Sequence, residues 1–132
     1  MKRPIEGKEG WYKETPINVE ALLTFPDGKG PFPVLLLVHS SGGAKEFTED
    51  YLEFMRDQQK PLLDMGIATM YLDNFSARGT KNTYRDQSKA SIWSTYVDTF
   101  MTLEYLSKNP KVNKGKIGIS GMSRGGNISM MA

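Results

Sequence analysis

The part of the sequence that decides the fold lies near the end of the chain, in the stretch Lys116-Ile117-Gly118-Ile119-Ser120-Gly121-Met122-Ser123-Arg124-Gly125-Gly126. Its first half is a short apolar run typical of a strand, and the residues after Ser123 can begin a helix. A Gly-x-Ser-x-Gly pattern between a strand and a helix is typical of a tight turn that lifts a serine hydroxyl above the sheet. Gly121 and Gly125 suit such a turn because a Cβ at either position would crowd the packed strand and helix.

Three segments upstream of this turn also have the patterns of strands. Residues 17–25 alternate between apolar and polar side chains, which indicates a half-buried strand. Residues 34–38 are a continuous apolar run, which is typical of a parallel strand covered on both faces, and 67–72 are expected to form the next buried strand. Together with a strand at 117–120 entering the turn, these segments predict an α/β sheet.

Helical patterns lie between these strands. One helix is expected from about Thr48, as its N-cap, to Gly66, with a kink or restart at Pro61. A second helix is expected around 93–103, where apolar side chains at helical spacing form a wide stripe, namely Trp93, Tyr96, Val97, Phe100 and Leu103. The alternation of strands and helices implies right-handed crossovers and a parallel sheet.

Parallel sheets bind ligands beyond the carboxyl ends of their strands. Three loops of this chain reach that edge, namely 39–43, 73–79 and the turn that contains Ser123. The agreement of three separate loops indicates a functional site there more strongly than the serine motif alone.

The residues at this edge predict nucleophilic chemistry. Ser123 is the expected nucleophile, and the backbone N–H of Arg124 is placed to bind a developing oxyanion. We expect the second oxyanion donor to be the backbone N–H of Ser41, beside two glycines that let the chain bend. His39, the only histidine, ends a buried strand, so we expect it to support the oxyanion loop rather than act as the base. Because a triad serine without its base loses ~10⁴–10⁶ in rate, these 132 residues alone are expected to be weakly active or inactive.

Composition argues against several other classes of function. The 17 basic and 15 acidic side chains are scattered, so no nucleic-acid binding is expected. No apolar run approaches ~20 residues and no signal peptide is visible, which predicts no membrane span and a cytoplasmic location, or a secreted one if the N-terminus is truncated. One histidine and no cysteine cannot build a zinc site, and Gly118-x-Ser120 lacks the second glycine of a dinucleotide fingerprint. We therefore predict no metal and no cofactor.

The segment Asp73-Asn74-Phe75-Ser76-Ala77-Arg78-Gly79, the approach Gly30-Pro31-Phe32-Pro33 and the serine turn together resemble the α/β-hydrolase superfamily. Within it, the chain is most similar to the dienelactone hydrolase family and its serine-bearing esterase relatives. The resemblance runs from about Thr24 to Ala132. Namesake dienelactone hydrolases carry a cysteine nucleophile and a glutamate near positions 39–41, whereas this chain has Ser123 and no glutamate there.

The resemblance implies a three-layer α/β-hydrolase-type sheet with helices on both faces. Residues 1–132 would be the N-terminal part of a single domain that ends just after the nucleophile elbow, with the C-terminal half and its triad Asp and His missing. The implied activity is hydrolysis of a small-molecule carboxylic ester or lactone through an acyl-enzyme on Ser123. Relatives use an arginine at the position of Arg78 to bind a substrate carboxylate, although an internal salt bridge is an alternative role for it.

Two alternatives remain open on the sequence. The chain can be a non-catalytic binding or interaction domain, which the absent base favours. It can also belong to a related acyl hydrolase, such as a serine peptidase or an acetyl esterase. The sequence does not fix the oligomeric state.

Overall fold

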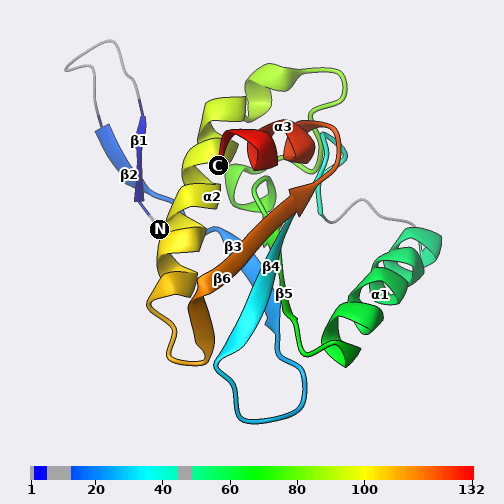
Figure 1. Cartoon of the computed structure of the whole chain (residues 1–132). Helices are drawn as coiled ribbons and strands as arrows, with labels where there is room; N and C mark the ends of the chain where they lie inside the picture. The colour runs from blue at the N-terminus through cyan, green and yellow to red at the C-terminus, as the bar shows by residue number, and fades with distance from the viewer. Residues whose placement is uncertain (1, 6–12, 45–48) are drawn as a thin grey trace.

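The computed structural model of the chain describes residues 2–5, 13–44 and 49–132 (Figure 1). Strands β1 (Lys2–Ile5) and β2 (Lys13–Pro16) pair with each other in antiparallel fashion. A second sheet has the strand order β3-β5-β4-β6. Its strands are β3 (Glu20–Thr24), β4 (Phe32–Val38), β5 (Ala68–Asp73) and β6 (Val112–Gly121).

The three central strands predicted from the sequence are parallel, as expected. Strand β4 lies between β5 and β6 and pairs with both in parallel register, so that Val38 is opposite Leu72 on one side and Gly121 on the other. Strand β3 pairs with β5 in antiparallel register and lies at one edge, so the sheet is mixed rather than wholly parallel. An antiparallel strand at the edge of an otherwise parallel sheet is common in doubly wound folds.

Helices cover both faces of this sheet. Figure 1 shows α1 (Glu49–Asp64) on one side and α2 (Ile92–Ser107) with α3 (Arg124–Met131) on the other. Two short 3₁₀ turns, Ser76–Arg78 and Gln87–Lys89, lie in the long connection from β5 to α2. The arrangement confirms the predicted three-layer α/β architecture.

Helix α1 differs from its prediction at Pro61. The helix runs through Pro61 without restarting, and the Pro61 carbonyl accepts the Met65 N–H at 3.0 Å. Pro61 has no N–H to donate to the Asp57 carbonyl one turn earlier, and the helix nevertheless continues for three residues beyond it. Gly66 ends the helix as expected, with a φ of 77° that suits glycine. The predicted cap Thr48 lies outside the described residues.

Strand β6 begins earlier than the sequence predicted. Residues 112–116, which a polar and lysine-rich composition placed in a loop, form the first half of the strand. Val112 is opposite Phe32 and Ile117 is opposite Val34, so a bulge separates the two halves of the ladder. Among the described strands only β4 pairs with β6, so its polar side chains lie at an edge, where exposed charge is common.

The apolar stripe predicted for α2 is buried only in part, since Tyr96 and Leu103 pack against the core while two other members are exposed. Trp93 and Phe100 of the apolar stripe are 64% and 40% exposed. The buried positions of the helix are mostly polar, namely Ser94, Thr95, Asp98, Thr99, Thr102 and Leu106. Hydroxyl groups on this face donate back to the helix itself, as Thr99 does to the Thr95 carbonyl at 2.8 Å and Thr102 to the Asp98 carbonyl at 2.7 Å. Burial is possible because these polar groups are paired within the protein.

The apolar core lies between the sheet and its helices. Side chains of the three parallel strands supply most of it, joined by one residue from each of α2 and α3. The buried members are Val34, Leu36, Val38, Ala68, Met70, Leu72, Leu106, Val112 and Ile128. This core fixes the strand ends, and therefore the positions of the loops that follow them.

Candidate active site

The turn from β6 to α3 holds Ser123 in an unusual backbone conformation. Its φ of 53° and ψ of −115° make it the only non-glycine residue with a positive φ in the described parts of the chain. The Gly125 N–H donates to the Met122 carbonyl at 2.9 Å and closes the turn, while Ser123 itself remains exposed. A serine in so strained a conformation costs on the order of 1–3 kcal/mol, and such outliers are concentrated at functional sites.

The two glycines of the motif let β4, β6 and α3 approach closely at this turn. A Cβ on Gly121 would lie 2.6 Å from the Gly125 carbonyl oxygen and 2.7 Å from that of Val38. A Cβ on Gly125 would lie 2.9 Å from the His39 carbonyl oxygen. No side chain fits at either position. This crowding is the reason that the sequence analysis gave for the two glycines.

The same close approach brings the loop after β4 next to the serine turn. Within this loop the Gly42 N–H donates to Ser40 Oγ and the Gly43 N–H to the Ser40 carbonyl, both at 3.1 Å. The Ser41 carbonyl accepts the Thr83 N–H at 2.8 Å. The N–H of Ser41, in contrast, has no hydrogen-bond partner among the described residues.

Arg124 is the first residue of α3, so its backbone N–H has no carbonyl within the helix to bind. The unpartnered N–H groups of Ser41 and Arg124 therefore belong to neighbouring segments, one after β4 and one after β6. Donors of this kind can stabilise negative charge that develops on a substrate oxygen.

His39 joins the loop after β4 to the loop after β5. One ring nitrogen, Nδ1, bonds the Ser40 carbonyl at 2.7 Å, and the other, Nε2, accepts the Asn74 N–H at 3.1 Å. Its ring also packs edge-on against Phe75. Burial lowers the pKa of His39 below its ordinary value, which outweighs the opposing effects of the Ser40 carbonyl and Asp73. Both nitrogens of this neutral ring are thus engaged by the backbone.

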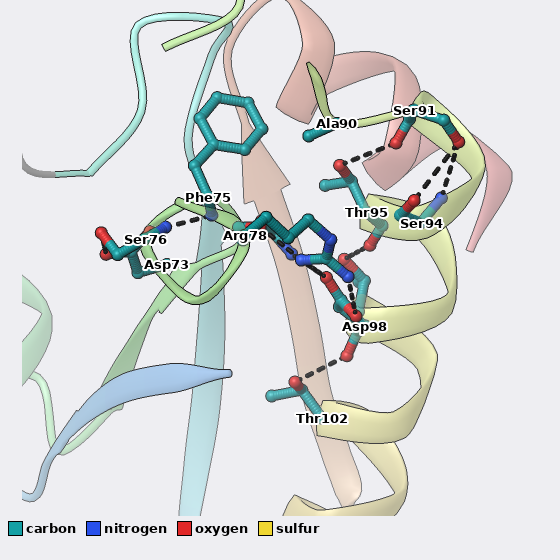
Figure 2. A network of polar contacts seen from close by, with 12 residues as sticks. Asp73, Phe75, Ser76, Arg78, Ala90, Ser91, Ser94, Thr95, Asp98 and Thr102 are labelled. Carbon is teal, nitrogen blue, oxygen red and sulfur yellow. Dashed lines mark hydrogen bonds and ion pairs between the residues drawn. The ribbon is translucent and has the colours of Figure 1, made fainter. Parts of the chain in front are cut away.

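Asp73 shapes the loop that follows β5. Its carboxylate accepts the backbone N–H groups of Phe75 and Ser76, each at 3.0 Å, and the Ser76 hydroxyl at 2.6 Å (Figure 2). Burial opposes ionisation of Asp73, but these hydrogen bonds outweigh it, so that the pKa of the carboxyl lies below its ordinary value.

Arg78 is held by a carboxylate of this chain. Its guanidinium and the Asp98 carboxylate approach to 2.7 Å, and the two side chains are only 4% and 2% exposed. Figure 2 shows the pair between the loop after β5 and helix α2. Asn74 completes the cluster, since its amide donates to Asp98 at 3.2 Å and its carbonyl accepts from Arg78. Of the two roles considered for Arg78, the internal salt bridge is the one present in the structure.

The side chain of Arg124 was overlooked at the sequence level, where only its backbone was considered. It is buried, and it donates to Thr83 Oγ1 at 3.0 Å, to Gln87 Oε1 at 2.9 Å and to the Ala90 carbonyl. Its guanidinium also lies 5.3 Å from the centre of the Phe75 ring. Burial lowers the pKa of Arg124, and the nearby charge of Arg78 lowers it further.

The polar spacing of α2 is the signal that would have revealed part of this network. Serine, threonine and aspartate at 94, 95, 98, 99 and 102 repeat on one helical face. Such a face requires buried partners if it points inward.

No helix in the described part of the chain has the length and hydrophobicity needed to cross a membrane.

Comparisons with known proteins bear on the fold. No protein-family model matches the chain, and no curated protein matches its sequence. Among solved structures, the chain is similar to Est1E from Butyrivibrio proteoclasticus with bound ferulic acid, with a TM-score of 0.67 and 21% identity, covering 88% of this chain and 43% of that chain. It is also similar to a 2,6-dihydroxy-pseudo-oxynicotine hydrolase, with a TM-score of 0.61 and 20% identity, covering 99% and 32% of the two chains.

A third similar structure is a Klebsiella pneumoniae protein assigned as a dienelactone hydrolase, with a TM-score of 0.59 and 18% identity, covering 92% of this chain and 48% of that chain. The chain thus spans less than half the length of each of the three structures. Likeness at such identities shows a shared fold and leaves the substrate undetermined. The chain therefore shares the α/β-hydrolase fold of these structures.

Proposed function

We propose that this chain carries the nucleophile and the oxyanion hole of a serine hydrolase that acts on carboxylic esters or lactones. The observation that supports the proposal best is the backbone of Ser123, which is strained, exposed and framed by two glycines that admit no side chain. A strained turn of this kind is the nucleophile elbow of the fold. The hydrolases among the similar structures support hydrolysis as the kind of reaction.

In the proposed reaction, Ser123 Oγ attacks the carbonyl carbon of the ester and loses its proton to a general base. The carbonyl oxygen becomes an oxyanion, which the N–H groups of Ser41 and Arg124 bind. Collapse of the tetrahedral intermediate breaks the ester bond, the alcohol leaves with a proton, and the acyl group remains on Ser123. Water then attacks the acyl-enzyme, releases the acid and restores the serine.

The general base is proposed to come from residues outside these 132. His39 is the only histidine, and both of its ring nitrogens are hydrogen-bonded to backbone groups. Taking the proton of Ser123 would require His39 to give up one of these bonds. The greater length of the similar structures leaves ample chain for an Asp and a His.

The proposed substrates are small-molecule esters or lactones, including aromatic acid esters. Est1E has been observed with ferulic acid, an aromatic carboxylic acid. Arg78 is paired with Asp98, so a substrate carboxylate would have to displace that partner in order to bind there. A serine peptidase or an acetyl esterase remains an alternative, which a panel of ester and peptide substrates would distinguish by relative kcat/KM.

The proposal is tested with the complete gene product that contains these residues. Ser123→Ala should lower the rate of p-nitrophenyl butyrate hydrolysis by ~10⁴-fold or more and abolish labelling by a fluorophosphonate. Ser120→Ala is the matched control, because Ser120 is an exposed serine three positions earlier on β6. If Ser123→Ala retained the wild-type rate and labelling, Ser123 would not be the nucleophile.

A non-catalytic binding domain is the second candidate, and the engagement of the single histidine favours it. This candidate requires the 132-residue chain to fold cooperatively without further residues. A single sharp thermal transition of a monomeric 132-residue protein would support it. Aggregation or the absence of a transition would count against it, and we expect that result because Trp93 and Met130 expose large apolar surfaces.

A further inference from the structure

The side chain of Arg124 is a buried cation whose hydrogen-bond partners all come from one segment. It is 5% exposed, and its hydrogen bonds go to residues between positions 83 and 90, the second half of the connection from β5 to α2. No carboxylate in the described part of the chain forms an ion pair with it. Hydrogen bonds to neutral acceptors therefore have to hold a charge that burial disfavours.

Two of these acceptors also touch Ser41. The backbone N–H of Thr83 donates to the Ser41 carbonyl at 2.8 Å, while its hydroxyl accepts from Arg124 at 3.0 Å. The amide of Gln87 donates to Ser41 Oγ at 3.3 Å, while its oxygen accepts from Arg124 at 2.9 Å. Thr83 and Gln87 thus each bridge Arg124 to Ser41.

The loop that contains Ser41 requires such support. Gly42 and Gly43 follow Ser41, and glycine has the greatest backbone freedom of any residue. Both glycines also lie against the same supporting segment, since a Cβ on Gly42 would meet the Tyr84 hydroxyl and one on Gly43 would meet the Lys81 carbonyl. The position of the Ser41 N–H therefore depends on Thr83 and Gln87, and both of these are bound by Arg124.

We propose that the Arg124 side chain is a positioning residue for the oxyanion hole, which places the Ser41 N–H by way of Thr83 and Gln87. This inference rests on the proposed function. Arg124 then contributes to both donors of the oxyanion hole. Its own backbone N–H is the first donor, and its guanidinium holds the second donor, the Ser41 N–H, in position. The planar fork of arginine can bind two acceptors at fixed angles, whereas lysine offers a single mobile charge. Shape as well as charge is therefore required at this position.

The test measures kcat and KM for p-nitrophenyl butyrate in the complete gene product. Loss of one oxyanion donor typically lowers kcat by ~10²–10³, so Arg124→Met should lower kcat by about 10–100-fold with little change in KM. Arg124→Lys should restore less than half of this loss on a logarithmic scale. The control is Arg85→Gln, because Arg85 is an exposed arginine of the same segment and should leave both constants unchanged.

A double-mutant cycle separates positioning from general destabilisation. Thr83→Val combined with Gln87→Met should also lower kcat, and adding Arg124→Met should cost little more, because all three act through one link. If the losses in kcat from the two-residue variant and from Arg124→Met multiplied in the combined variant, the proposal would be overturned. If Arg124→Met does not fold, the variant with Thr83→Val and Gln87→Met still tests the proposal through its loss of kcat.

A measurement that does not depend on catalysis distinguishes this inference from the proposed function. Amide hydrogen exchange at Thr83, whose N–H bonds the Ser41 carbonyl, should quicken at least about tenfold in Arg124→Met and remain unchanged in Arg85→Gln. If Ser123→Ala abolishes activity but Arg124→Met changes neither kcat nor this exchange, the inference fails while the proposed function stands. If Ser123→Ala retains full activity, the proposed function fails.

Discussion

The apolar cluster within the sheet and the polar cluster beyond its strand ends are both buried, but they are held together differently. Leu36 and Leu72 of the first are stabilised by the area that they remove from water, which has no preferred direction. Arg78, Asp98 and Arg124 of the second are stabilised by hydrogen bonds with fixed partners. The apolar cluster should therefore tolerate changes of shape at constant volume, whereas the polar cluster should not tolerate the loss of one partner.

The largest effect is expected from breaking the polar cluster at Asp98. Asp98→Asn leaves the Arg78 guanidinium buried without a counter-charge, which should lower the free energy of unfolding by about 3–5 kcal/mol. Urea unfolding measures the loss. The control is Glu104→Gln, which removes an exposed carboxylate paired with Lys108 on the same helix and should change nothing measurable. Equal effects at the two positions would contradict the contrast.

The apolar cluster is tested at Leu36, which is fully buried in β4. Leu36→Ala should lower the free energy of unfolding by about 2–5 kcal/mol because it removes apolar contacts and leaves a cavity. Leu36→Met keeps most of the volume and should cost less than about 1.5 kcal/mol. Chemical denaturation of both variants checks the difference, and a costly Leu36→Met would mean that this core also depends on exact shape.

The junction of the two clusters is tested at Gly125, where β4 and α3 come into contact. Gly125→Ala places a methyl group 2.8 Å from the Val38 carbonyl carbon, so the free energy of unfolding should fall by about 1–3 kcal/mol. The neighbouring Gly126→Ala would meet only the Gly121 carbonyl oxygen, at 3.2 Å, and should cost less. Thermal melting of the two variants gives the comparison. A larger loss in Gly126→Ala would contradict the observed packing.

The smallest expected effect is the contribution of His39 to the pH dependence of the free energy of unfolding. Its folded pKa is below the 6.5 of a free histidine, so the unfolded state binds more protons once the pH falls below about 6.5. The free energy of unfolding should therefore decline as the pH falls from 6.5 towards the folded pKa. Asp73, also lowered, should add a separate decline below its ordinary pKa of 3.8.

His39→Gln isolates this contribution. The variant should lack the decline that begins below pH 6.5 and keep the one that begins below pH 3.8. Urea midpoints across this range provide the measurement. An unchanged pH profile in His39→Gln would mean that His39 titrates alike in both states.

The sequence was most informative where the local pattern and the tertiary structure agree. Mostly apolar segments predicted β4 and β5 nearly to their ends, because a strand buried on both faces has no reason to alternate. The serine turn was equally clear, since Gly121 and Gly125 are required by packing within the motif itself.

Helix α2, whose apolar stripe is buried only in part, shows where sequence patterns are insufficient. Counting apolar residues pointed to Trp93 and Phe100, but the buried face contains Asp98, whose partner Arg78 lies in a different loop. The benefit of burying Asp98 depends on that pairing, which no local window contains. The bridge from Arg124 through Thr83 to Ser41 was missed for the same reason.

In the described part of the chain β6 lies at the edge of the sheet, which has a consequence for what can pair with it. Among the described strands only β4 pairs with it, so the other side of β6 presents backbone groups that can template a further strand. Lys114 and Lys116 discourage such pairing along the first half of the strand, whereas 117–121 carries no charged side chain. This unprotected half leads directly into Ser123. A strand that paired with this half of β6 would cover those backbone groups and lie beside the turn that holds Ser123.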